Sequence, residues 1–279
     1  MTNFMILDGH RIAYTEAGSK SNPPIIFIHG LMSYHGVWNT TIEKLKDRFF
    51  CVSFDLLGFG DSDKPDDGDY SIAKQAECVL NIADHFGIDK FMVAGHSMGG
   101  QIATYLSAVI APGRVQKLVF VDAVVTGQLS DQVQREIKPM VMWGDKIPFV
   151  YKLLRPLRDW KPLAYWSFQS WFYKIKELPF ESWERNRFHA TRSDIAHSTA
   201  KAWGEIEAAD LRPHLGNIAS PTLIIFGKQD GVVPVEQAYE FKERCPSAQL
   251  VVYDDCGHFP MHENFDPYIV ALENFLLEL

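Results

Sequence analysis

The segment KFMVAGHSMGGQIATYLSAVI, residues 90–110, places a serine between an apolar run and a stretch of helical period. The apolar run predicts a buried strand, and the stretch after it predicts a helix. A serine at so sharp a strand-to-helix turn has positive φ, which is costly for a residue with a β-carbon. Backbone crowds this kind of turn, so Gly95 and Gly99 must lack a side chain. The pattern therefore predicts that Ser97 is a nucleophile.

A nucleophilic serine needs two donors for the oxyanion that forms on its substrate. Met98 follows the serine at the helix N-terminus, where its N–H is free to bind an anion. After the apolar run 25–29 comes Gly30-Leu31-Met32, a turn whose small first residue lets backbone approach a ligand. We expect the N–H groups of Leu31 and Met98 to form the oxyanion hole.

A serine hydroxyl also needs a base, and the base needs an orienting acid. In a strand–helix architecture these partners are expected in the order serine, acid, histidine, each after a strand. His258, in DDCGHFPMHE (254–263), follows the last apolar run and is the predicted base. His96, beside the serine, is predicted to be a packed or hydrogen-bonded support. His189 and His197 could touch substrate, but core or surface positions are favoured for them.

The acid has two candidates. Asp230 follows the apolar run TLIIFG (222–227) in the turn GKQDGVVP (227–234). Asp122 ends the preceding apolar run and is the alternative, because related folds can supply the acid there. Asp254 and Asp255 are too close to His258 in sequence to orient it from a separate loop. We favour Asp230.

Apolar runs and helical segments alternate along most of the chain. Strands are predicted at 3–7, 11–16, 25–29, 50–55, 91–95, 117–122, 222–227 and 249–253, and helices at 38–46, 72–86, 98–110, 235–243 and 268–277. Several runs are apolar throughout, as in strands that are buried on both faces of a sheet. The alternation predicts an α/β fold with a mostly parallel sheet and helices on both faces.

The alternation stops between residues 123 and 209. This segment holds six of the seven tryptophans and carries 13 basic and 10 acidic side chains, whereas the remainder carries 14 and 25. Its short helical patterns and five prolines predict a helical cap inserted between two strands, with an apolar inner face. We therefore expect a core of residues 1–122 and 210–279, interrupted by a cap of residues 123–209.

Composition excludes several classes of function. The net charge is −8 and there is no basic run, so a nucleic-acid partner is disfavoured. No apolar run reaches the ~18 residues needed to span a bilayer, and the N-terminus does not resemble a signal peptide. The four cysteines are unpatterned, which predicts reduced thiols and a cytoplasmic location. GFGD (58–61) does not complete a dinucleotide motif, and His258 and His262 have metal-like spacing but no further ligands nearby, so neither a cofactor nor a metal is expected.

The chain resembles the α/β-hydrolase superfamily along essentially its whole length. The resemblance rests on HGLM (29–32), DLLGFGDSDKP (55–65), GHSMGG (95–100), GKQDGVVP (227–234) and DCGHFPMHENF (255–265), in family order and spacing. The most similar groups are capped esterases, carbon–carbon-bond hydrolases and cofactor-free haloperoxidases. The resemblance implies an eight-stranded core, a cap after Asp122, and a Ser97, His258 and Asp230 triad. The dehalogenase and epoxide-hydrolase branches carry aspartate where this chain has Ser97.

These residues predict a serine hydrolase that cleaves small to medium apolar or aryl carboxylic esters through an acyl-enzyme. One alternative is a carbon–carbon hydrolase of aromatic ring-cleavage products. A dienoate substrate carries a carboxylate, so Arg192 or Arg187 would then have to face Ser97. A second alternative is a ligand receptor on the same fold that does not turn over its ligand.

Overall fold

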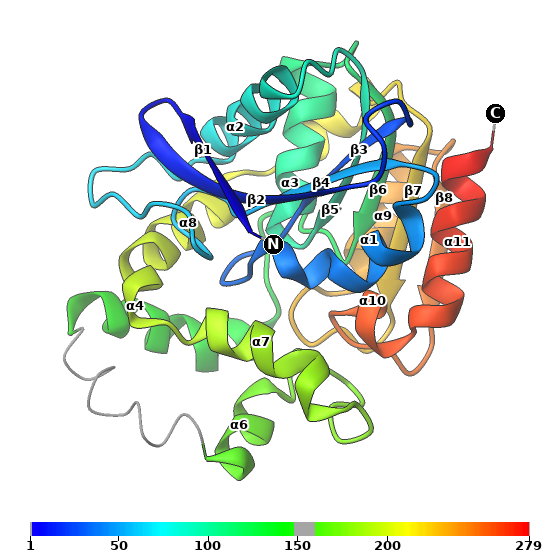
Figure 1. The fold of residues 1–279 in the computed structure, drawn as a ribbon. Helices are drawn as coiled ribbons and strands as arrows, with labels where there is room; N and C mark the ends of the chain where they lie inside the picture. Colours follow the sequence, from blue (N-terminus) through cyan, green and yellow to red (C-terminus); the bar gives the residue numbers. More distant parts are fainter. Residues whose placement is uncertain (1, 148–159, 279) are drawn as a thin grey trace.

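The computed structural model describes residues 2–147 and 160–278, and its centre is a sheet of eight strands in the order β1-β2-β4-β3-β5-β6-β7-β8 (Figure 1). The strands are β1 (Asn3–Leu7), β2 (His10–Ala17), β3 (Pro24–Ile28), β4 (Phe50–Phe54), β5 (Phe91–His96), β6 (Val115–Val121), β7 (Thr222–Gly227) and β8 (Gln249–Tyr253). The pairs β1–β2 and β2–β4 are antiparallel, and all other pairs are parallel. The predicted α/β fold with a mostly parallel sheet is confirmed.

The central strands are apolar on both faces because both faces are covered. Every residue of β4, β5 and β7 is buried. The edge strand β1 instead exposes Phe4 and Ile6 to solvent. A strand buried on two sides has no polar face, which explains the continuous apolar runs in the sequence.

Helices lie on both faces of the sheet. On one face α1 (Asn39–Leu45) contacts α11 (Phe265–Leu277), and on the other α2 (Ile72–His85) packs beside α3 (Met98–Tyr105), as Figure 1 shows. The short α10 (Pro260–Glu263) precedes α11, and α9 (Glu236–Arg244) joins β7 to β8. α2 begins at Ser71, whose hydroxyl accepts a hydrogen bond from the Lys74 N–H. No helix in the two described ranges is both long and apolar enough to cross a bilayer.

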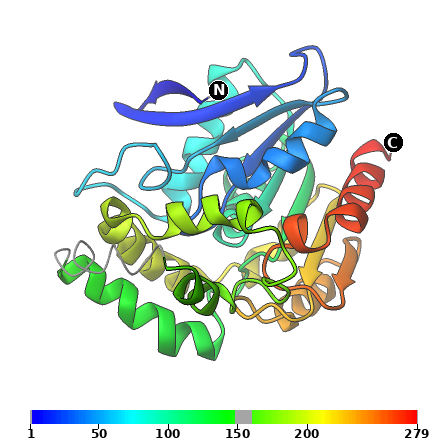
Figure 2. The same cartoon turned by 60° about the horizontal axis from the view of Figure 1, so that its bottom comes forward.

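Between β6 and β7 the chain leaves the sheet and forms a group of helices. They are η3 (Val133–Ile137), α4 (Lys138–Lys146), α6 (Lys161–Phe168), α7 (Phe180–Ala190), η4 (Ser193–Ile195) and α8 (Ala196–Ala208), followed by η5 (Arg212–Asn217). Figures 1 and 2 show α4, α6 and α7 together on one side of the sheet. The division of the chain at residues 122 and 210 into core and cap stays a prediction.

Candidate active site

Ser97 occupies the turn between β5 and α3, with φ 55° and ψ −121°. L-residues rarely adopt this backbone conformation, and it is kept only where the surroundings enforce it. A β-carbon on Gly95 would lie 2.3 Å from the Gly99 carbonyl oxygen, and one on Gly99 would lie 2.4 Å from the Ile28 carbonyl oxygen. The two glycines are therefore steric requirements of the turn.

Met98 directly follows Ser97 in this turn, and Leu31 lies in the loop after β3. Met98 is the first residue of α3, so its N–H has no partner within the helix. A β-carbon on Gly30 would lie 2.8 Å from the Ser97 Cβ, which shows how closely the loop after β3 approaches the serine. Leu31 and Ser97 line the same pocket. The oxyanion role of the Leu31 and Met98 N–H groups stays a prediction.

His258 and Asp230 form a buried hydrogen-bonded pair. The His258 Nδ1 lies 2.7 Å from the Asp230 Oδ2, and the two side chains are 3% and 0% exposed. The other carboxylate oxygen accepts the N–H groups of Val232 at 2.7 Å and Val233 at 3.0 Å. Three donors thus fix the carboxylate, which in turn fixes the ring and leaves His258 Nε2 available for another partner.

Asp122, the alternative acid, directly follows β6 and lies close to this pair. It is fully buried, its φ is 45°, and its Oδ1 accepts the Gly227 N–H at 2.8 Å. Atoms of Asp122, Asp230 and His258 lie within 4.8 Å of one another. Burial and then the adjacent Asp230 carboxylate raise the pKa of Asp122 well above its usual range. Asp122 therefore favours its neutral form, and the His258 ring bonds to Asp230.

His96 supports the histidine loop. Its Nε2 lies 2.8 Å from the His258 carbonyl oxygen, so the ring donates Nε2–H in the neutral tautomer. Burial and the neighbouring His258 ring lower the pKa of His96 well below its usual value. Its ring packs 4.7 Å from the Phe259 ring, centroid to centroid. This position agrees with a supporting role.

The histidine loop also rests on the inserted segment, a contact that sequence reasoning missed. The His258 N–H donates to the Trp171 carbonyl oxygen at 2.9 Å. The Glu263 carboxylate accepts the Gly257 N–H at 3.1 Å and the Lys174 N–H at 3.0 Å. The partly buried Glu263 side chain thereby ties the loop that carries His258 to residues 171–174. The only sequence signal was a glutamate five residues after the histidine.

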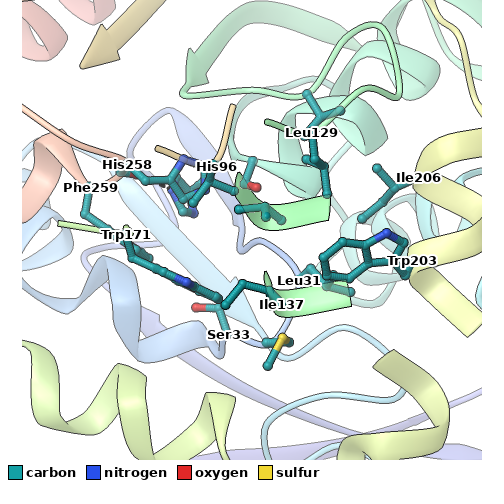
Figure 3. Close-up of a pocket in the computed structure, with 15 residues that line it drawn as sticks. Leu31, Ser33, His96, Leu129, Ile137, Trp171, Trp203, Ile206, His258 and Phe259 are labelled. Atoms are coloured by element: carbon teal, nitrogen blue, oxygen red, sulfur yellow. Dashed lines mark hydrogen bonds between the residues drawn. The ribbon is translucent and has the colours of Figure 1, made fainter. Parts of the chain in front are cut away.

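A small pocket with about 30 Å³ of internal space opens at Ser97. Figure 3 shows His258 and Trp171 on one side and Trp203 with Ile206 on the opposite side. The lining residues are Leu31, Met32, Ser33, His96, Ser97, Val124, Leu129, Val133, Ile137, Trp171, Trp203, Ile206, Val232, His258 and Phe259. Lysine, arginine, aspartate and glutamate do not occur among the described residues of this lining. The pocket thus suits an apolar group beside a polar reacting centre.

The two arginines considered for a carboxylate substrate lie elsewhere. Arg192 bonds to Asp61 at 2.7 Å and, through two nitrogens, to Asp194 at 2.9 and 2.6 Å. Arg187 is buried on α7. Neither belongs to the described pocket lining, nor do His189 and His197. His189 stacks on Tyr34, and His197 bonds to Asp145.

Buried neutral histidines give the protein a predicted sensitivity to acid. Burial lowers the pKa of both His29 and His262 to about 4. The unfolded chain binds these protons below about pH 6.5, so stability is lost as the pH falls from about 6.5 to about 4. We expect the free energy of unfolding to drop by about 2 kcal/mol for each of the two histidines between pH 7 and pH 5.

Urea denaturation at pH 7 and at pH 5 measures this drop in the free energy of unfolding. His262→Gln removes one of the histidines with a lowered pKa and should reduce the drop, whereas His85→Gln, on the exposed end of α2, should leave it unchanged. An equal drop in wild type and His262→Gln would contradict the assignment.

Comparison with known proteins gives the same architecture. The family model described as alpha/beta hydrolase fold matches residues 23–265. An uncharacterized protein of Mycobacterium tuberculosis (strain H37Rv) is 30% identical over 98% of this chain and 80% of its own length. A 2-hydroxymuconate semialdehyde hydrolase of Pseudomonas putida is 27% identical over 81% of this chain and 76% of its own.

Among solved structures, a bacterial membrane phospholipase A superposes with a TM-score of 0.80 and 28% identity, over 99% of this chain and 85% of the other. The family model covers most of the chain, and strands β3 to β8, the serine turn and the histidine loop lie within its range. The chain therefore belongs to the alpha/beta hydrolase family, and it is a hydrolase.

Proposed function

We propose that the protein is a serine carboxylesterase that cleaves esters with an apolar acyl group. The observation that carries the proposal is that Ser97 and His258 line the same pocket. Ser97 lies in its strained turn, and His258 Nδ1 is hydrogen-bonded to Asp230. A nucleophile, a base and an orienting acid on three different loops are the parts that acyl transfer needs.

In the proposed reaction, His258 Nε2 takes the proton of the Ser97 hydroxyl while the oxygen attacks the ester carbonyl. The negative oxygen of the tetrahedral intermediate is held by the N–H groups of Leu31 and Met98. The bond to the alcohol then breaks, and the alcohol leaves with the proton from His258. Water, deprotonated by the same histidine, releases the carboxylic acid and restores Ser97.

The apolar lining of the pocket supports an ester over a ring-cleavage dienoate. A dienoate carboxylate buried without a cation would be costly, and the described lining offers no arginine or lysine. Arg192 is engaged by Asp61 and Asp194. The similar phospholipase A structure also belongs to a class that cleaves carboxylic esters. A carbon–carbon hydrolase, as in the P. putida relative, is the alternative that this pocket supports less well.

A substrate panel tests the proposal. We expect p-nitrophenyl butyrate and hexanoate to be turned over with kcat/KM at least about 100-fold above that of a ring-cleavage dienoate, because only the dienoate must bury a charge. The reaction is followed by p-nitrophenol release and by dienoate absorbance. Faster cleavage of the dienoate would favour the carbon–carbon alternative, and binding of both without turnover would favour a receptor.

A further inference from the structure

The carboxyl group of Asp122 has one oxygen that no donor serves. Its Oδ1 accepts the Gly227 N–H at 2.8 Å, whereas its Oδ2 is buried and finds no donor among the described residues. The whole residue is fully buried, so bulk water does not supply one. A buried carboxylate oxygen without a donor is costly, because it has lost the hydrogen bonds that it made to water. A proton on Oδ2 removes this cost, since the oxygen then becomes a donor itself.

Backbone contacts hold Asp122 against the end of β7. The Asp122 N–H donates to the Ile225 carbonyl oxygen at 2.9 Å, and the Asp122 φ of 45° lies in a region that aspartate tolerates better than most residues. The Asp230 N–H donates to the Gly227 carbonyl oxygen at 3.3 Å. Asp122 and Asp230 are therefore both anchored on Gly227, and the backbone brings their carboxyl groups together.

Asp230 is the ionised member of this pair. It accepts His258 Nδ1–H and the N–H groups of Val232 and Val233, and an ionised carboxylate is the form that accepts three donors best. One atom from each of the Asp122, Asp230 and His258 side chains lies within 4.8 Å of the other two. Two buried carboxyl groups this close do not both ionise, so Asp122 keeps a proton. In agreement, burial and then the Asp230 charge raise the pKa of Asp122, and a hydrogen bond to the Asp230 side chain adds to the rise.

The surrounding titratable groups supply no positive charge that could replace this proton. They are Cys256, Glu263, Lys174 and His96. Burial raises the pKa of Cys256 and lowers that of His96, so both favour their neutral forms. The Glu263 charge disfavours a further negative charge at Asp122, and Lys174 pairs with Asp255 at 3.8 Å.

We propose that Asp122 is a positioning residue in its acid form, whose Oδ2–H donates to the Asp230 carboxylate and leaves one negative charge, and not two, beside the His258 ring. The proton stays on the carboxyl pair during the reaction. Two charges would favour the imidazolium form of His258, and the base would then become available only at higher pH. This consequence rests on the proposed esterase function, whereas the shared proton rests on the contacts of Asp122 and Asp230.

Infrared spectroscopy tests for the proton without any substrate. A protonated carboxyl group has a C=O stretching band that is separate from the bands of a carboxylate, and we expect such a band from Asp122 at pH 7. Asp122→Asn, which can still accept the Gly227 N–H, should lose the band. The control Asp254→Asn removes a carboxylate whose side chain is 77% exposed, and the band should remain. Wild type and Asp122→Asn without a difference in this band would overturn the proposal.

The dependence of kcat/KM on pH, with p-nitrophenyl butyrate, tests what the proton does. Asp122→Ala removes the donor to Asp230, and the acid limb of the profile should move up by about one pH unit. Asp122→Asn can donate its NH₂ group in place of the acid proton, so its acid limb should lie where that of wild type lies. A residue with a structural role alone would lower the rate at every pH and leave the limb in place, and this result in Asp122→Ala would also overturn the proposal.

Two further results separate this proposal from the esterase and from misfolding. If wild type cleaves no ester, the esterase proposal fails, and the infrared band still decides whether Asp122 holds the proton. Alanine at a φ of 45° is less well tolerated than asparagine, so a thermal melt of Asp122→Ala comes before its assay. If that variant does not fold, the infrared comparison of wild type with Asp122→Asn decides.

Discussion

Replacement of Ser97 by alanine is expected to lower kcat on p-nitrophenyl butyrate by at least about 10⁴-fold, because the acyl-enzyme can no longer form. The pocket and the oxyanion donors remain, so KM should change little. Alanine carries the same β-carbon as serine and meets the same φ of 55°. The variant should therefore unfold at nearly the temperature of wild type, which a thermal melt will verify.

Ser33→Ala provides the matched control. Ser33 lines the same pocket but stands outside the proposed triad. Its removal should change kcat by less than about tenfold, since no proton transfer or bond depends on it. A loss in Ser33→Ala as large as that in Ser97→Ala, or full activity in Ser97→Ala, would contradict the assigned nucleophile.

Asp230→Asn is expected to lower kcat by about 10⁴-fold. The asparagine oxygen can still accept the N–H groups of Val232 and Val233, which turns its NH₂ group toward His258 Nδ1. The ring must then carry its proton on Nε2, and this tautomer cannot take the proton of Ser97. The geometry of the site survives while the base is lost.

Asp122→Asn should differ sharply from Asp230→Asn. The raised pKa of Asp122 favours a neutral side chain there, and asparagine can still accept the Gly227 N–H. We expect kcat to fall by less than about tenfold. Steady-state kinetics of the two purified variants measures the difference. The reverse pattern, with Asp122→Asn inactive and Asp230→Asn active, would make Asp122 the acid.

Much of the sheet could be predicted because its strands are buried on both faces. A run such as TLIIFG has no polar side to present, and β7 duly buries every residue. Helix bounds were less accurate. The last helix begins at Phe265 rather than at 268, because Pro260–Glu263 already forms α10 and the chain turns directly into α11.

Within the site, the features that could be predicted are those that neighbouring residues in the sequence determine. The turn at Ser97 is specified by Gly95 and Gly99, whose missing side chains are visible in the sequence. The environment of Asp122 was not predictable, because its burial beside Asp230 depends on how β6 and β7 lie next to each other. A carboxylate at a strand end looks the same in sequence whether it is ionised or neutral.

The burial of side chains in the inserted segment could not be predicted from the sequence either. Its tryptophans are alike in sequence, yet Trp203 lines the pocket while Trp143 is 68% exposed. Each position depends on helix packing, such as that of α4 on α8, and short helices interrupted by proline leave no long periodic pattern to show it. The composition could indicate a distinct segment, but its inner and outer faces required the structure.

Labelling with a fluorophosphonate is the most direct test of the nucleophile. The reagent phosphonylates an activated serine with loss of fluoride, and intact-mass and peptide mass spectrometry locate the adduct. The account predicts one adduct per chain, on Ser97, and none in Ser97→Ala. An adduct on another residue, or no adduct on folded wild-type protein, would contradict it.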